Sequence, residues 1–181
     1  GWVSYVISEA VIIVIGLIYI AVMGISIKRD MQYHIIAFKD VIVSILAGYM
    51  MIPMVLFINN VSMLFSKNYL EAASQTLLTY PFVVQIILMA GIPALVEEFI
   101  FRGLFYGTYR KCGVLKGALM SGLVFGLFHL NINQFCYAFV IGVVFAFLVE
   151  ATGSIWSSVL AHFASQRRRG AGCSPCPAPS S

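Results

Sequence analysis

The sequence has few charged residues. Asp, Glu, Lys and Arg make up only 10% of its 181 residues, whereas hydrophobic residues make up 61%. A soluble domain is typically about 25% charged. A chain with so few charges could not cover a surface exposed to water, so the composition excludes an ordinary soluble protein. We therefore predict an integral membrane protein that forms one domain.

Cysteines are also few, and their spacing favours no metal or redox site. Cys112 and Cys136 stand alone, and we expect them to act as small apolar residues. Cys173 and Cys176 form a single C-x-x-C pair, but a zinc site needs more ligands than two. The sequence also lacks a nucleotide-binding loop and a flavin-binding fingerprint, so it indicates neither cofactor.

The C-terminal tail differs in composition from the rest of the chain. From residue 166 the sequence reads QRRRGAGCSPCPAPSS, which resembles disordered segments in its content of Arg, Gly, Ser and Pro. We predict that residues 166–181 are disordered, and our hypothesis is that they are not native to the protein. Arg167, Arg168 and Arg169 supply three units of the net charge of +4, so the charge balance indicates no nucleic-acid partner.

Long hydrophobic runs fill most of the sequence. A helix that crosses about 30 Å of hydrocarbon needs roughly 20 mostly apolar residues. The apolar segments are 2–27, 41–65, 82–106, 114–130, 135–149 and 154–165, and the last is too short to span alone. We predict an all-α fold in which residues 1–165 form a polytopic bundle of about six hydrophobic helices around a polar cavity within the membrane.

Three charged residues interrupt the third apolar segment, in the stretch ALVEEFIFRGLFYG. Each charge at the bilayer centre costs about 2.5–3.5 kcal/mol, so Glu97, Glu98 and Arg102 are expected to face protein or water. Glu98 and Arg102 are four residues apart and can pair on one helix face. Glu97 lies about 100° further round the helix and does not align well with Arg102, so it is available for a catalytic role. The alternative is that all three reach water at the cytoplasmic end of the helix.

Two histidines lie in other apolar segments. His129 ends the stretch FGLFHL, one turn after Phe125, and His162 lies in LAHFAS, whereas His34 lies in a polar loop. A single histidine in an apolar helix is more often structural than catalytic. Burying these polar groups against one another would keep them from lipid, so we predict that Glu97, His129 and His162 converge on one pocket. Small residues in the fourth segment would permit the close packing: Gly117, Ala118, Ser121, Gly122 and Gly126.

These motifs, in this order, resemble those of the CPBP family, the CAAX-protease and bacteriocin-processing (Abi) intramembrane proteases. They are E-E-x-x-x-R from Glu97, F-x-x-x-H from Phe125, and H-x-x-x followed by a polar residue from His162. The resemblance covers about residues 82–165 and implies a helical membrane core with its polar groups in an intramembrane cavity. The third motif of the family ends in Asn, whereas this chain has Gln166, which puts the activity of this chain in question.

The residue types suggest hydrolysis by an activated water, since no Ser or Cys with a neighbouring base is present. We predict that Glu97 is the general base, that His129 holds the same water, and that His162 with Gln166 donates hydrogen bonds to the oxyanion. The supporting residues would be Glu98, Arg102 and Phe125. The alternative is a zinc enzyme with Glu97, His129 and His162 as ligands. No HExxH pattern is present, so we favour a mechanism without a metal cofactor.

The resemblance therefore implies an intramembrane endopeptidase of the CAAX-protease type, in the plasma membrane of a bacterium. Its partners would be the lipid bilayer and a peptide or membrane-protein substrate, prenylated or not. The alternative function is a non-catalytic bacteriocin-immunity or peptide-binding membrane protein, and a third is an inactive scaffold held by its buried charges. Substitution of Glu97 and His129 would discriminate between them.

Overall fold

The computed structural model describes the backbone of residues 2–66 and 80–171, and these residues are almost entirely helical. The long helices are α1 (Trp2–Met23), α3 (Phe38–Met63), α8 (Val114–Phe128), α9 (Ile132–Thr152) and α10 (Ile155–Ala171), and the short helix α2 (Ile27–Asp30) follows α1. Between residues 82 and 112 the chain forms one continuous rod of six segments: α5 (Phe82–Ile86), η2 (Ile87–Gly91), α6 (Ile92–Glu98), η3 (Phe99–Tyr106), α7 (Gly107–Tyr109) and η4 (Arg110–Cys112). The predicted all-α fold is confirmed.

Within residues 2–66 and 80–171, four helices are long and apolar enough to cross a membrane. They are Val6–Met23, Phe38–Met63, Phe82–Cys112 and Ile132–Thr152, and the apolar helix Val114–Phe128 is shorter. Each corresponds to a predicted apolar segment, with ends that differ by a few residues. The six predicted segments are therefore all helices, and the chain is an integral membrane protein.

Helix α10 extends further than the sequence predicted. It continues to Ala171, past the boundary at residue 165 that the composition indicated. The side chains of Arg167–Arg169 and all of residues 172–181, with Cys173 and Cys176, lie outside what the structure describes. The disorder and foreign origin of the tail stay predictions.

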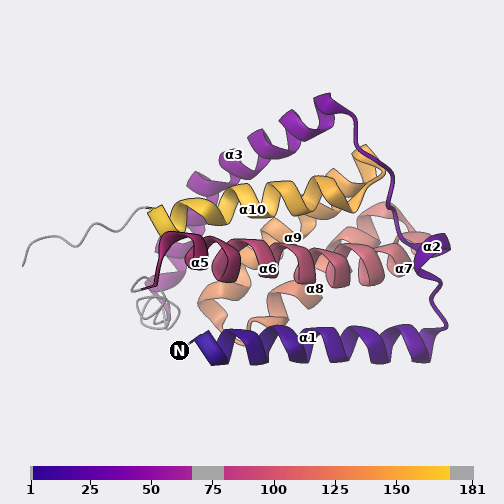
Figure 1. The fold of residues 1–181 in the computed structure, drawn as a ribbon, viewed down its shortest axis with the longest axis horizontal. Helices are drawn as coiled ribbons and strands as arrows, with labels where there is room; N and C mark the ends of the chain where they lie inside the picture. The colour runs from indigo at the N-terminus through magenta and orange to yellow at the C-terminus, as the bar shows by residue number, and fades with distance from the viewer. Residues whose placement is uncertain (1, 67–79, 172–181) are drawn as a thin grey trace, which may run out of the picture.

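The helix that carries the charged motif lies at the centre of the bundle. In Figure 1, α1 runs along one side of it and α10 lies on the other side, with α3 beyond α10 and with α8 and α9 behind. This rod contains two π-helical segments, η2 and η3. Pro93 follows η2 and cannot donate a backbone hydrogen bond, and its ring crowds the carbonyl four residues earlier, which lies in η2. Widening of the helix there relieves that conflict.

Small residues set the helix spacing, as predicted for the fourth segment. All five predicted small residues of α8 are buried. A β-carbon on Gly142 of α9 would lie 2.7 Å from the α-carbon of Gly122, so the two backbones are in contact. A β-carbon on Gly48 of α3 would overlap the carbonyl oxygen of Ala161 in α10. Such contacts hold membrane helices together, because lipid provides no hydrophobic force between them.

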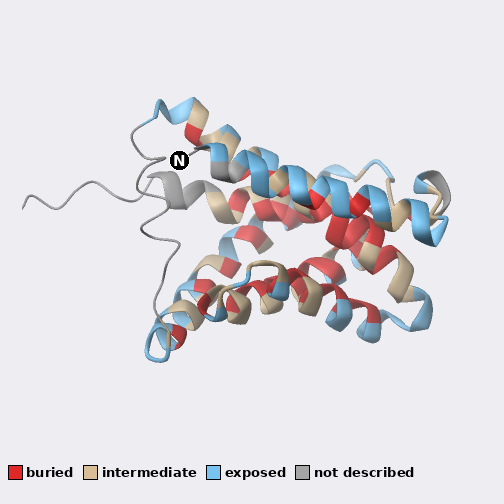
Figure 2. Ribbon diagram, turned by 90° about the horizontal axis from the view of Figure 1, so that it is seen from below, coloured by how far each residue is buried: buried red, intermediate tan, exposed pale blue. Residues whose placement is uncertain are grey.

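The outer surface of the bundle is apolar, unlike that of a soluble protein. Figure 2 shows the buried residues along the inner sides of the helices. Large apolar side chains such as Met50 and Phe57 are exposed on α3, whereas Glu98, Arg102 and Asn133 are almost fully buried. An outer surface this apolar is consistent with contact with lipid. Buried polar groups in a membrane protein are often functional, so these residues are candidates for a functional site.

Candidate active site

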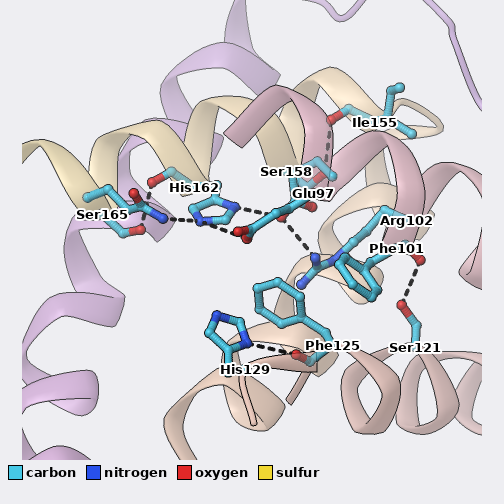
Figure 3. A network of polar contacts seen from close by, with 12 residues as sticks. Glu97, Phe101, Arg102, Ser121, Phe125, His129, Ile155, Ser158, His162 and Ser165 are labelled. Carbon is cyan, nitrogen blue, oxygen red and sulfur yellow. Dashed lines mark hydrogen bonds and ion pairs between the residues drawn. The ribbon is translucent and has the colours of Figure 1, made fainter. Parts of the chain in front are cut away.

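The site is built from residues of three neighbouring elements and the end of a fourth. Glu97 and Glu98 end α6, Arg102 lies in η3, His162 lies in α10, and His129 caps the C-terminus of α8. Figure 3 shows the acidic, basic and imidazole side chains pointing toward one another from these helices. The packing of α10 against α6 therefore creates the site.

Glu98 is the most connected of these residues. Its Oε1 lies 2.9 Å from Nη1 of Arg102 and accepts a hydrogen bond of 2.8 Å from Nδ1 of His162. Both partners of the ion pair have side chains with no exposed surface. The predicted pairing of Glu98 with Arg102 is confirmed, and the proposal that all three charges reach water at a helix end is wrong for these two residues.

The guanidinium of Arg102 is held by aromatic rings as well as by charge. Its Cζ lies 4.3 Å from the centroid of the Phe125 ring and 5.4 Å from that of Phe145. Cation–π contacts of this kind are strongest where water is excluded. None of the three guanidinium nitrogens of Arg102 has a hydrogen-bond partner among the described residues, although Nη1 lies within ion-pair distance of Glu98. The rings thus take the place of the second carboxylate that a buried arginine would otherwise need.

Glu97 and His162 lie next to each other, as predicted. Oε2 of Glu97 is 3.8 Å from Nε2 of His162, and 14% of the Glu97 side chain is exposed. This distance is too long for a direct hydrogen bond. Glu97 therefore differs from Glu98, because Glu97 is partly accessible, whereas Glu98 is fully buried and pairs with Arg102.

Both ring nitrogens of His162 have partners. Nδ1 donates to Glu98, and the amide nitrogen of Gln166, one helical turn later, lies 2.5 Å from Nε2. Since Nδ1 carries the proton, Nε2 accepts from the Gln166 amide. The glutamine that replaces the expected asparagine thus still reaches the histidine.

His129 is positioned by its own helix and by Phe125. Its Nδ1 donates to the backbone carbonyl of Phe125 over 2.9 Å, which leaves the lone pair on Nε2. The Phe125 ring lies edge-on to His129, with centroids 5.0 Å apart, and also contacts His162 at 6.2 Å. The structure thus brings Glu97, Glu98 and His162 together directly and joins His129 to them through Phe125. A shared pocket for His129 and Glu97 stays a prediction.

The zinc alternative has no ligand set in this geometry. Among the residues that the structure describes, no three His, Cys, Asp or Glu side chains are placed to hold a metal ion. Both nitrogens of His162, one of the three suggested ligands, already have hydrogen-bond partners. The choice between a metal-free and a zinc-dependent mechanism stays a prediction.

The sequence reasoning missed two residues of this region. Phe145 of α9 lies against Arg102 and His162, but nothing in the sequence separates it from other core aromatics. Glu9 of α1 has a buried Oε2 without a hydrogen-bond partner among the described residues. A signal for Glu9 was present, since it is the one acidic residue in the first apolar segment.

Comparison with known proteins finds similarity over the region that carries these residues. The model of the family described as "Type II CAAX prenyl endopeptidase Rce1-like" matches residues 79–166, which contain all three motifs. A protein of Bacillus subtilis (strain 168) named "Putative membrane peptidase YdiL" is 32% identical over 78 residues. That alignment covers 42% of this chain and 32% of the relative, so the chain spans about a third of the relative's length. No solved structure matches the chain significantly.

Proposed function

We propose, from the premise that residues 79–166 belong to the CPBP family of CAAX-type and bacteriocin-processing membrane proteases, that this membrane protein is an intramembrane endopeptidase. The observation that carries the proposal is the pairing of a partly accessible carboxylate, Glu97, with His162 inside a bundle whose outer surface is apolar. Its partner would be a peptide or membrane-protein substrate, and its location the plasma membrane of a bacterium.

The chemical step is the addition of water to a peptide carbonyl. Glu97 takes one proton from the water while the water oxygen bonds to the carbonyl carbon, and Glu97 then gives that proton to the amine as the carbon–nitrogen bond breaks. His129 accepts a hydrogen bond from the same water through Nε2. No metal is required in this scheme, which stays our preference over the zinc alternative.

The developing oxyanion needs a donor, and Gln166 fits this role better than His162 itself. Nε2 of His162 accepts from Gln166, so it has no proton to donate in this arrangement. The Gln166 amide carries a second N–H that can point to the oxyanion. His162 then positions Gln166 and is itself fixed by Glu98, which is neutralised by Arg102. Removing one such donor typically costs about 10²–10³ in rate.

The proposal is tested by cleavage of internally quenched peptides by the purified chain in liposomes. One peptide ends in a prenylated CAAX sequence, since the matching family is described as a prenyl endopeptidase, and the other is an unmodified apolar peptide. We expect Glu97→Gln to lower kcat by about 10²–10⁴, the usual contribution of a general base. Asp40→Asn, at the start of α3, is the matched control and should leave kcat unchanged.

Two outcomes would contradict hydrolysis by this site. One is a Glu97→Gln variant that cleaves at the rate of the unaltered chain, and the other is an unaltered chain that cleaves neither peptide while it still binds them, which favours the peptide-binding alternative. Treatment with a chelator should leave cleavage intact. Activity that is lost with a chelator and restored by zinc would reverse the preference for a metal-free mechanism.

A further inference from the structure

Phe145 is a buried aromatic residue of α9 that the mechanism above does not use. It is 0% exposed. The centroid of its ring lies 5.4 Å from Cζ of Arg102 and 5.6 Å from the centroid of the His162 ring, with the two ring planes at 45°. One ring therefore contacts both the residue that pairs with Glu98 and the residue that lies beside Glu97.

Backbone packing fixes where this ring lies. Gly142 precedes Phe145 by three residues, so the two share a face of α9. A β-carbon on Gly142 would lie 2.7 Å from the α-carbon of Gly122 and 3.3 Å from Cδ1 of Phe125. Helix α9 is thus in backbone contact with α8 one turn before Phe145. Because the ring is also fully enclosed, it has little freedom to move.

The hydrogen bonds of His162 leave one motion of its ring open. Nδ1 lies 2.8 Å from Oε1 of Glu98, and Nε2 is bonded to the Gln166 amide. Bonds to an imidazole lie near the plane of the ring, so they fix the two nitrogens but not the tilt of the ring about the line that joins them. A closely packed neighbour can fix that tilt. Phe145 is such a neighbour, and Phe125 is a second one whose ring centroid is further away, at 6.2 Å.

Glu98 links the two contacts of Phe145 to each other. The same oxygen, Oε1, lies 2.9 Å from Nη1 of Arg102 and 2.8 Å from Nδ1 of His162. A shift of the guanidinium would therefore move the carboxylate and, through it, the imidazole. The ring of Phe145 attracts the guanidinium through its negative face, and this attraction is strongest where water is excluded. Phe145 thus restrains both groups that share this oxygen.

We propose that Phe145 is a positioning residue for the proposed hydrolysis. It holds Arg102 and His162 against the same carboxylate oxygen, and so keeps Nε2 of the imidazole directed at the Gln166 amide. This inference rests on the proposed function, in which that amide donates to the oxyanion. Phe145 has no exposed surface with which to contact a substrate. Its loss should therefore slow the chemical step and leave substrate binding unchanged.

The kinetic test uses the liposome assay with the same two peptides. Phe145→Leu and Phe145→Met each keep a buried apolar side chain but remove the ring, and each should lower kcat about tenfold at unchanged KM. The matched control is Phe139→Leu in the same helix, since the Phe139 ring stacks on Phe135, and it should leave kcat unchanged. An unaltered kcat in either Phe145 variant overturns the proposal, even where Glu97→Gln abolishes cleavage.

A second test does not depend on activity. The sequence has three histidines, so histidine labelled with a nitrogen isotope gives nuclear magnetic resonance signals from three imidazoles, and His162→Gln identifies those of His162. The unaltered chain and Phe139→Leu should show His162 with its proton on Nδ1, whereas Phe145→Leu should show a mixture of both tautomers.

The two tests separate this inference from the proposed function. A single form with the proton on Nδ1 in Phe145→Leu would sink the positioning role alone. A chain that cleaves neither peptide but shows the change of tautomer would sink the proposed hydrolysis and support the restraint of His162 by Phe145.

Discussion

At the scale of single residues, two adjacent glutamates have different environments. Glu98 is fully buried, accepts from His162 and pairs with Arg102, whereas Glu97 is partly exposed and lies beside Nε2 of His162. Their different directions around the helix cause this difference, because only one of them can face Arg102 four residues later. Glu98 therefore stabilises the structure of the site, and Glu97 is available for the proposed role of general base.

Removal of Arg102 should destabilise the protein strongly. Arg102→Met leaves Glu98 buried without a compensating charge, which typically costs about 3–5 kcal/mol. Thermal or denaturant unfolding in detergent would measure the loss. The matched control is Arg110→Met, whose pair with Glu150 is partly exposed and should cost about 0–1 kcal/mol.

The double variant Glu98→Gln with Arg102→Met checks the reason for that loss. It removes both charges, so it should be clearly more stable than Arg102→Met alone. If the double variant is as unstable as the single one, lost packing against Phe125 and Phe145, and not the unpaired carboxylate, is the cause.

At the scale of helices, the site depends on how closely α10 approaches its neighbours. Gly48 of α3 lies directly on the backbone of Ala161, the residue before His162. His162 in turn reaches Glu98 across the contact between α10 and α6. A small shift of α10 would therefore change the distance between His162 and both glutamates.

Gly48→Ala should disturb that contact, because its β-carbon would overlap a backbone carbonyl that cannot rotate away. We expect a loss of about 1–3 kcal/mol in unfolding free energy, typical of overpacking, together with lower cleavage. Gly91→Ala is the matched control, since its β-carbon would meet only the carbonyl of Ile86 at 3.7 Å. Equal stability of the two variants would mean that the α3–α10 contact is not tight.

At the scale of the whole molecule, the bundle presents apolar side chains outward, and its largely apolar interior also encloses charged and polar side chains. Leu46, Met50 and Phe57 are exposed along α3, while Ser44 of the same helix is buried. Hydrophobic burial cannot drive such an arrangement in water, and lipid contact on the outside explains it.

An arginine on the outer surface of α3 should therefore impair membrane insertion. Leu46→Arg, at a position 55% exposed within a candidate span, should cost about 2.5–3.5 kcal/mol of insertion free energy. Ile35→Arg, 98% exposed between spans, should have no effect. Fractionation of membranes and a topology reporter would compare the two variants, and equal insertion would argue against lipid at Leu46.

Composition and apolar run length were enough to determine the class of this protein from sequence alone. An all-helical membrane fold follows because backbone groups in lipid must satisfy one another, and only long apolar helices occur here. Spacing within one helix likewise predicted the pairing of Glu98 with Arg102, since residues four apart share a face. The motifs near Glu97, His129 and His162 indicated a resemblance to CAAX-type membrane proteases, and a family model described as Rce1-like matches the same region.

Only the tertiary structure decided which groups meet across helices. The bond between Glu98 and His162 and the aromatic rings around Arg102 join residues far apart in the chain. No periodicity along one helix can predict such contacts, because they depend on the rotation and offset of each helix relative to its neighbour. Glycine contacts such as Gly48 on Ala161 and Gly16 on Ile100 set those offsets, and they are visible only once the helices are packed.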